Sequence, residues 1–154
     1  MKNPKKDVKL YNVLFPLWVL MLFPQAWLII LPGNFIIDSA VLLLTLLILK
    51  VGEKKQRYKK HILKIYGFGL LADVVGAAFL MYMSFMSGMG EHSIAMDSPW
   101  ITIPAILISA GLIFVFNYFI TFNKEDKKTR LILSLVFAIV TAPYTFLVPS
   151  SWLY

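Results

Sequence analysis

The sequence predicts an all-helical, polytopic integral membrane protein, a single bundle of five transmembrane helices. Of 154 residues, 59% are apolar and 15% are charged, against roughly 45–50% and about 25% in soluble domains. The apolar residues form long blocks instead of amphipathic stripes, and no Lys or Arg lies in the interior of a block. A chain of this size exposes more apolar surface than a water-soluble fold could bury, so a bilayer is the expected solvent.

Five apolar blocks have lengths near the ~20 residues that an α-helix needs to cross about 30 Å of hydrocarbon. Since lipid offers backbone N–H and C=O groups no partner, and alternating strand patterns are absent, each block is predicted to be a helix. The predicted spans cover residues 10–31, 35–50, 65–86, 100–122 and 131–148.

The connections between these blocks are short, and the whole chain, residues 1–154, is expected to be one membrane domain. Leu31–Asn34 reads LPGN, with Pro and Gly placed to end one helix and start the next. Asp38 would then lie in the first turn of the second helix, where a carboxylate complements the positive end of the dipole. Residues 50–64 are expected to form a basic loop, residues 87–99 a polar loop and residues 123–130 a charged loop.

The Lys and Arg residues predict the orientation. Four lie in residues 2–9, seven in residues 50–64 and four in residues 124–130, which accounts for all 15. The positive-inside rule therefore predicts a cytoplasmic N-terminus and an extracytoplasmic C-terminus, with an odd number of crossings. Three tryptophans fall near the expected outer interface: Trp27, Trp100 and Trp152. The plasma membrane, the inner membrane of a bacterial cell, is the simplest location.

The net charge of +7 has an explanation that needs no nucleic acid. Each Lys or Arg near an anionic membrane surface contributes about 1 kcal/mol of attraction. A nucleic-acid partner would require a folded basic face with stacking aromatics, and loops this short cannot build one. The predicted partners are the lipid bilayer and anionic lipid headgroups at the cytoplasmic loops.

One acid interrupts the third block, which reads YGFGLLADVVGAAF around Asp73. At about 100° per residue, Asp73 shares a helix face with most of the small and polar residues of that block. That face includes three small residues that would let another helix approach closely: Gly69, Gly76 and Ala77. A carboxylate inside the membrane costs ~2.5–3.5 kcal/mol unless protonation, a hydrogen-bond donor or water relieves it.

Asp73 supports two interpretations. It is either a proton or cation site in a permeation path, or a hydrogen-bonded packing residue that holds the third helix against the fourth. Asn117, at comparable depth in the fourth span, is a candidate amide donor to Asp73, and Tyr66 is a candidate hydroxyl donor.

Prolines supply a weaker candidate site. Pro24 and Pro143 each deprive a carbonyl of its helical donor, and Gln25 beside the first could help to coordinate a cation. The structural alternative, a kink whose free carbonyl is satisfied by neighbouring groups, is favoured because proline is common in spanning helices.

Metal binding and catalysis have little support. Met86, Met89 and His92 suggest a soft Cu(I) site, but their irregular spacing equally suits gap-filling methionines, and neither a metal nor a cofactor is predicted. Cysteine is absent, and His61 falls in the basic loop, where solvent is expected to surround it. No hydrolase, zinc-protease, phosphate-loop or dinucleotide motif occurs, so the chain is not predicted to be an enzyme.

The favoured function is therefore transport or permeation, with Asp73 as the proton- or cation-responsive group and a homo-oligomer or a partner membrane protein completing the pathway. The alternative is a non-transporting accessory or regulatory membrane subunit that docks through the small-residue face. A third hypothesis assigns residues 50–64 to holding anionic lipid headgroups.

Overall fold

The computed structural model describes residues 24–87 and 99–147, and within these ranges all regular structure is helical. The elements are α1 (Pro24–Ile48), α2 (Lys54–Ser87), α3 (Pro99–Phe116), the π-helical turn η3 (Asn117–Thr121), α4 (Lys127–Val140) and the 3-10 turn η4 (Tyr144–Leu147). Four segments of the described chain are long and apolar enough to cross a membrane: Trp27–Ile48, Lys54–Met83, Pro99–Thr121 and Lys127–Leu147. The all-helical, apolar class predicted from composition is confirmed.

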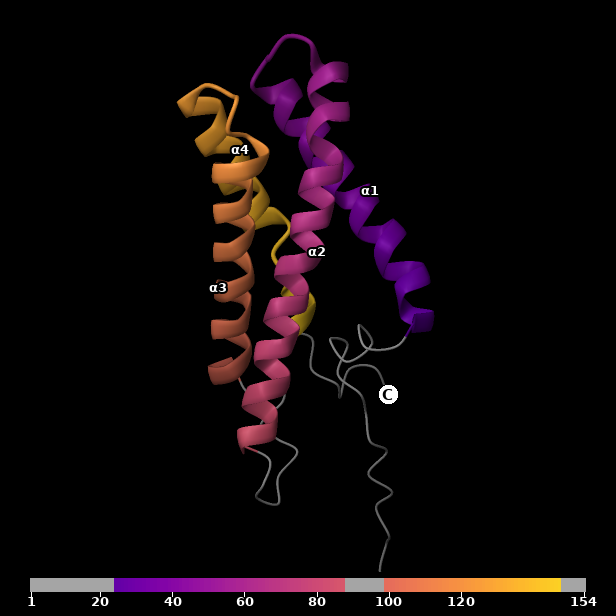
Figure 1. Cartoon of the computed structure of the whole chain (residues 1–154), viewed down its shortest axis with the longest axis vertical. Helices are drawn as coiled ribbons and strands as arrows, with labels where there is room; N and C mark the ends of the chain where they lie inside the picture. Colours follow the sequence, from indigo (N-terminus) through magenta and orange to yellow (C-terminus); the bar gives the residue numbers. More distant parts are fainter. Residues whose placement is uncertain (1–23, 88–98, 148–154) are drawn as a thin grey trace, which may run out of the picture.

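The four helices form an up-and-down arrangement in which α2 packs between α1 and α3, and α4 packs against α3 and α1 (Figure 1). The α1–α2 and α3–α4 loops lie at the same end of the molecule. We call it the basic end because it carries Lys50 and Lys124 of the loops and the Lys and Arg residues in the N-terminal turns of α2 and α4. α1 diverges from its neighbours toward its N-terminus. This divergence leaves space between α1 and the other helices.

The predicted turn at Leu31–Asn34 is wrong, because α1 runs unbroken through Pro32 and Gly33. Pro removes one backbone hydrogen bond, whereas a turn in hydrocarbon would leave several backbone groups without partners. The second half of the predicted 10–31 span and the predicted 35–50 span are therefore one helix, and residues 10–23 lie outside the described residues. Asp38 consequently lies in the middle of α1 and not in a first turn.

The α1–α2 connection is tighter than the predicted basic loop. The Val51 N–H donates to the Leu46 carbonyl at 3.3 Å, and Lys50 has a φ of 51°, the left-handed conformation that commonly ends a helix. α2 then begins at Lys54, so most of the predicted loop is helical. Lys, Gln and Arg are good helix formers, and neither Gly nor Pro interrupts them between Lys54 and Lys64. With 34 residues, α2 is about 51 Å long, which exceeds the hydrocarbon thickness.

Two apolar clusters hold the helices together. The first lies toward the basic end and includes Leu42 of α1, Ile65 of α2, Ile113 of α3 and Phe137 of α4. The second lies toward the opposite end and joins α2 and α3 to the chain after α4; its members are Ala77, Leu80, Ala105, Ile106, Ala142 and Phe146. Many other large apolar side chains, such as Leu28 at 79% exposed, point outward. That distribution suits a bundle surrounded by lipid.

The predicted interruption of the last span at Pro143 is confirmed. α4 ends at Val140, and the chain turns through Pro143 into η4. Pro143 cannot donate to the Ile139 carbonyl, and the Tyr144 hydroxyl donates to it instead. The carbonyl that proline leaves free is thus satisfied by a neighbouring side chain, as the structural interpretation of Pro143 predicted.

Candidate functional site

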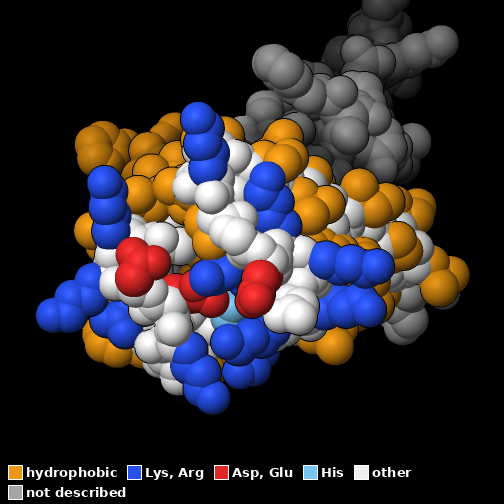
Figure 2. All heavy atoms as spheres, turned by 90° about the horizontal axis from the view of Figure 1, so that it is seen from above, with side chains coloured by type: hydrophobic (Ala, Val, Ile, Leu, Met, Phe, Trp, Pro, Cys, Tyr) orange, Lys and Arg blue, Asp and Glu red, His pale blue; other side chains and the backbone are white. Residues whose placement is uncertain are grey.

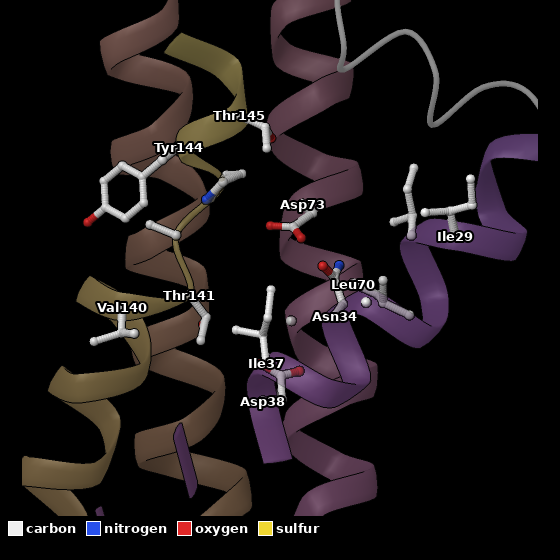
Figure 3. Close-up of a pocket in the computed structure, with 15 residues that line it drawn as sticks. Ile29, Asn34, Ile37, Asp38, Leu70, Asp73, Val140, Thr141, Tyr144 and Thr145 are labelled. Atoms are coloured by element: carbon white, nitrogen blue, oxygen red, sulfur yellow. The ribbon is translucent and has the colours of Figure 1, made fainter. Parts of the chain in front are cut away.

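A cavity of about 530 Å³ lies between α1, α2 and the chain segment that follows α4 (Figure 3). Most of its wall is apolar, and the residues that form this part are Ile29, Ile30, Ile37, Leu70, Val140, Ala142, Pro143 and Tyr144. The polar side chains on the wall are those of Asn34, Asp38, Asp73, Thr141 and Thr145. Two carboxylates thus face a largely apolar space.

Asp73 reaches the cavity from the middle of α2. The residue is 7% exposed, and its Oδ1 atom has no hydrogen-bond partner among the described residues. Figure 3 shows its carboxyl group directed into the space between α2, α1 and the chain after α4. The acid singled out from the sequence is therefore buried within the protein and aimed at the cavity.

Asp38 contributes the second carboxylate, from α1, and sequence reasoning missed it. The residue is 6% exposed, and its Oδ2 atom lies 3.7 Å from the position that a Cβ on Gly69 would occupy. A Cβ on Gly69 would meet this carboxylate at ordinary van der Waals distance, so the Asp38 side chain lies against α2 at Gly69. Asp38 and Asp73 line the same cavity from adjacent helices. Asn34 lies one turn before Asp38 on the same wall.

The cavity has an unbalanced electrostatic character. Its described lining contains two acids and no Lys, Arg or His. Burying an ionised carboxylate in apolar surroundings is costly unless a countercharge or hydrogen bonds compensate for the lost water. A proton or a bound cation must therefore neutralise the Asp38–Asp73 pair, or water must solvate it. The site is thus suited to binding a proton or a cation.

The small residues of α2 pack against helices of the same chain. The Ser109 hydroxyl of α3 donates to the Ala72 carbonyl at 3.0 Å, beside Gly76. A Cβ on Gly76 would lie 2.0 Å from Ser109 Oγ, so only glycine permits this approach. Ala77 is buried in the second apolar cluster.

Asn117 is not the donor to Asp73 that the sequence suggested. Ser109 is the α3 residue beside Asp73 in the helix pair, and Asn117 lies two turns, or about 12 Å, closer to the basic end. Both amide atoms of Asn117 are buried without a hydrogen-bond partner among the described residues. It lies instead at the start of the π-helical turn η3.

None of the remaining sequence candidates is among the described residues that line this cavity. The Tyr66 ring packs edge-on against Phe35, with ring centroids 5.5 Å apart. Gln25 lies in the first turn of α1, but its side chain is not among those that the structure describes. Met86 is exposed near the end of α2, whereas Met89 and His92 lie outside the described residues. Residues 24–87 and 99–147 contain no group of three or more His, Asp or Glu that could hold a metal.

A second polar cluster lies at the basic end. The Glu125 side chain, 6% exposed, forms an ion pair with Arg57 and accepts a hydrogen bond from His61 Nε2 at 2.9 Å. His61 is 2% exposed and packs against Phe122, so the expectation of a solvated histidine is wrong. Figure 2 shows this end, where Lys and Arg side chains surround the few acids. The cluster ties α2 to the α3–α4 loop.

Comparisons of this chain with protein-family models, with curated proteins and with solved structures give no match.

Proposed function

We propose that this protein is a small multi-pass membrane protein for transport or permeation, in which the Asp38–Asp73 pair is the proton- or cation-responsive group. The observation that carries the proposal is the placement of two buried carboxylates, from two different helices, on the wall of one cavity. Ionisable residues inside a membrane are rare and usually mark ion pathways or proton relays. Because no basic residue is among the described lining residues, a mobile cation or proton would neutralise the negative charge of this pair.

The helix break beside the cavity supports this function. Binding sites of membrane transporters are typically formed where a spanning helix is discontinuous and irregular backbone lines a cavity. The segment from Val140 to Thr145 has this character and forms one wall. One turn toward the basic end, Leu42 and Phe137 belong to a buried apolar layer. A permeating ion would have to cross this layer, which would therefore act as the closed gate.

We further propose a location in the plasma membrane with the basic end in the cytoplasm. The Lys and Arg residues of the basic end, in the two loops and in the N-terminal turns of α2 and α4, support this orientation through the positive-inside rule. The start of α1 and the chain after α4 would then lie toward the outer side. A cytoplasmic N-terminus depends on residues 1–23, which lie outside the described residues, and stays a prediction.

The same basic side chains are the proposed contact with anionic lipid headgroups. Association into a homo-oligomer or with a partner membrane protein would use the outward apolar surface of the helices. The accessory-subunit alternative required a free small-residue face on α2. In the described structure Gly69 faces Asp38 of α1, and Gly76 faces Ser109 of α3, so neither glycine is available for a partner.

Flux measurements on reconstituted vesicles test the proposal. With a proton gradient and a trapped pH-sensitive dye, wild-type protein should give a flux that Asp73→Asn and Asp38→Asn each reduce at least tenfold, because the amide can neither carry a proton nor balance a cation. Asp126→Asn is the matched control, since it also neutralises one acid but lies in the α3–α4 loop. Equal flux in wild type and Asp73→Asn would remove Asp73 from the mechanism.

A further inference from the structure

We propose that the cavity binds a lipophilic organic monocation, an ammonium or phosphonium centre carrying an apolar body, with the charge held by Asp38 and Asp73. The inference rests on the proposed function and narrows it to a substrate class. Its basis is the combination of size, wall chemistry and charge in one cavity.

The size of the cavity suits an organic molecule. Its volume of about 530 Å³ falls in the ~300–1,000 Å³ range of small-molecule pockets. One water molecule occupies about 30 Å³ of liquid. A proton or a single inorganic ion would therefore leave most of the space to water or lipid, whereas an organic cation of moderate size would fill it.

The chemistry of the cavity wall also favours an organic cation over an inorganic one. A dehydrated inorganic cation such as Mg²⁺ or Ca²⁺ needs about six to eight oxygen ligands. The wall of this cavity offers mainly hydrocarbon, from Ile29, Ile37 and Leu70 on the helices and from Val140 and Pro143 at the break after α4. Apolar substituents of a ligand would gain about 25 cal/mol for each Å² that leaves water.

The two carboxylates on the wall favour a positively charged ligand. Asp73 is more than nine-tenths buried, directs its carboxyl group into the cavity and has an oxygen without a partner among the described residues. Asp38 adds a second carboxylate on the facing helix. An anion of the same shape would meet two like charges. A monocation would balance one carboxylate, and a proton on the other would complete the compensation, whereas a neutral molecule would balance neither.

Equilibrium dialysis of the detergent-solubilised full chain with tetraphenylphosphonium tests the charge requirement. We expect saturable binding that Asp73→Asn and Asp38→Asn each weaken at least tenfold and that Asp126→Asn leaves unchanged. Tetraphenylborate, an anion of the same shape, should show no binding that depends on either aspartate. Equal affinity in wild type and Asp73→Asn would overturn the inference.

A matched pair of glycine variants tests the location without altering charge. Gly33 lines the cavity, Gly67 of α2 does not, and a Cβ at either position meets no atom within 4 Å. Gly33→Leu should weaken tetraphenylphosphonium binding at least tenfold by filling the cavity, and Gly67→Leu should match wild type. If Gly33→Leu binds as wild type does, the ligand is not in this cavity and the inference fails.

The two proposals fail in different experiments. Proton flux that depends on Asp73, together with no tetraphenylphosphonium binding, would overturn the substrate class and support the transport function. Binding that depends on the carboxylates, in vesicles that show no flux of protons or of the phosphonium, would support the binding site and overturn transport.

Discussion

Glu125 and Asp126 are adjacent in the α3–α4 loop but occupy opposite environments. Glu125 is buried against Arg57 and His61, whereas Asp126 is exposed and caps α4 by accepting a hydrogen bond from the Thr129 N–H at 3.0 Å. This backbone hydrogen bond is the main cause that lowers the pKa of Asp126 below its ordinary value of 3.8, and a hydrogen bond with the Thr129 side chain is the second cause. The cap is therefore strongest when the carboxyl is ionised.

Asp126→Ala should lower the melting temperature at pH 7, because the α4 N-terminus loses its acceptor. Since the pKa of Asp126 is depressed on folding, its stabilisation is present above pH 3.8 and is lost as the pH falls through the lower, folded pKa. The difference between variant and wild type should accordingly shrink in acid. Melting curves in detergent at pH 7 and pH 3 measure this, with Asp126→Asn as a variant that still caps. A pH-independent difference would show that the charge has no part in the cap.

At the scale of elements, the α2–α3 contact depends on one glycine. Gly76 is buried where a Cβ would overlap Ser109 Oγ and press on Phe146 Cε2 at 3.0 Å and the Ala105 carbonyl at 3.4 Å. The close approach also lets Ser109 donate to the Ala72 carbonyl. Small residues at helix crossings play this role in membranes, where no hydrophobic force drives the helices together.

Gly76→Ala should destabilise the bundle by about 1–3 kcal/mol, because α2 and α3 must separate or Ser109 must rotate and lose its hydrogen bond. Adding Ser109→Ala removes the overlapping hydroxyl and should recover part of this loss, which makes the two changes non-additive. Gly111→Ala is the matched control, since its Cβ would meet open space and alanine is the better helix former. Unfolding in detergent compares Gly76→Ala, Ser109→Ala, their combination and Gly111→Ala with wild type. A neutral Gly76→Ala would show that the close approach of α2 and α3 does not depend on this glycine.

At the scale of the whole molecule, the four described helices place residue 24 and residue 147 away from the basic end. If all four helices span a membrane, the described chain crosses it an even number of times. The five-span prediction with a cytoplasmic N-terminus would require a further crossing before α1. The basic residues between 2 and 9 favour that crossing, and the continuity of α1 leaves it only residues that precede Pro24.

Single-cysteine labelling determines the orientation, and the natural chain has no cysteine to remove. With a membrane-impermeant reagent, Gly52→Cys and Lys124→Cys should react only after permeabilisation, and Gly90→Cys should react in intact cells. Lys6→Cys should be protected in intact cells if the five-span prediction holds. Labelling of Lys6→Cys in intact cells would contradict that prediction, and labelling of Gly52→Cys there would reverse the proposed orientation.

The membrane class, the helical structure and the clustering of basic residues at one end follow from the sequence by itself, because they depend on composition and on runs of neighbouring residues. Asp73 can also be recognised in the sequence, because a single acid in an apolar block is conspicuous even when the residues around it in space are unknown. The continuity of α1 through Pro32 and Gly33, the burial of His61 and the convergence of Asp38 with Asp73 came only from the tertiary structure. Each depends on which helices pack together, and local sequence does not contain that long-range information.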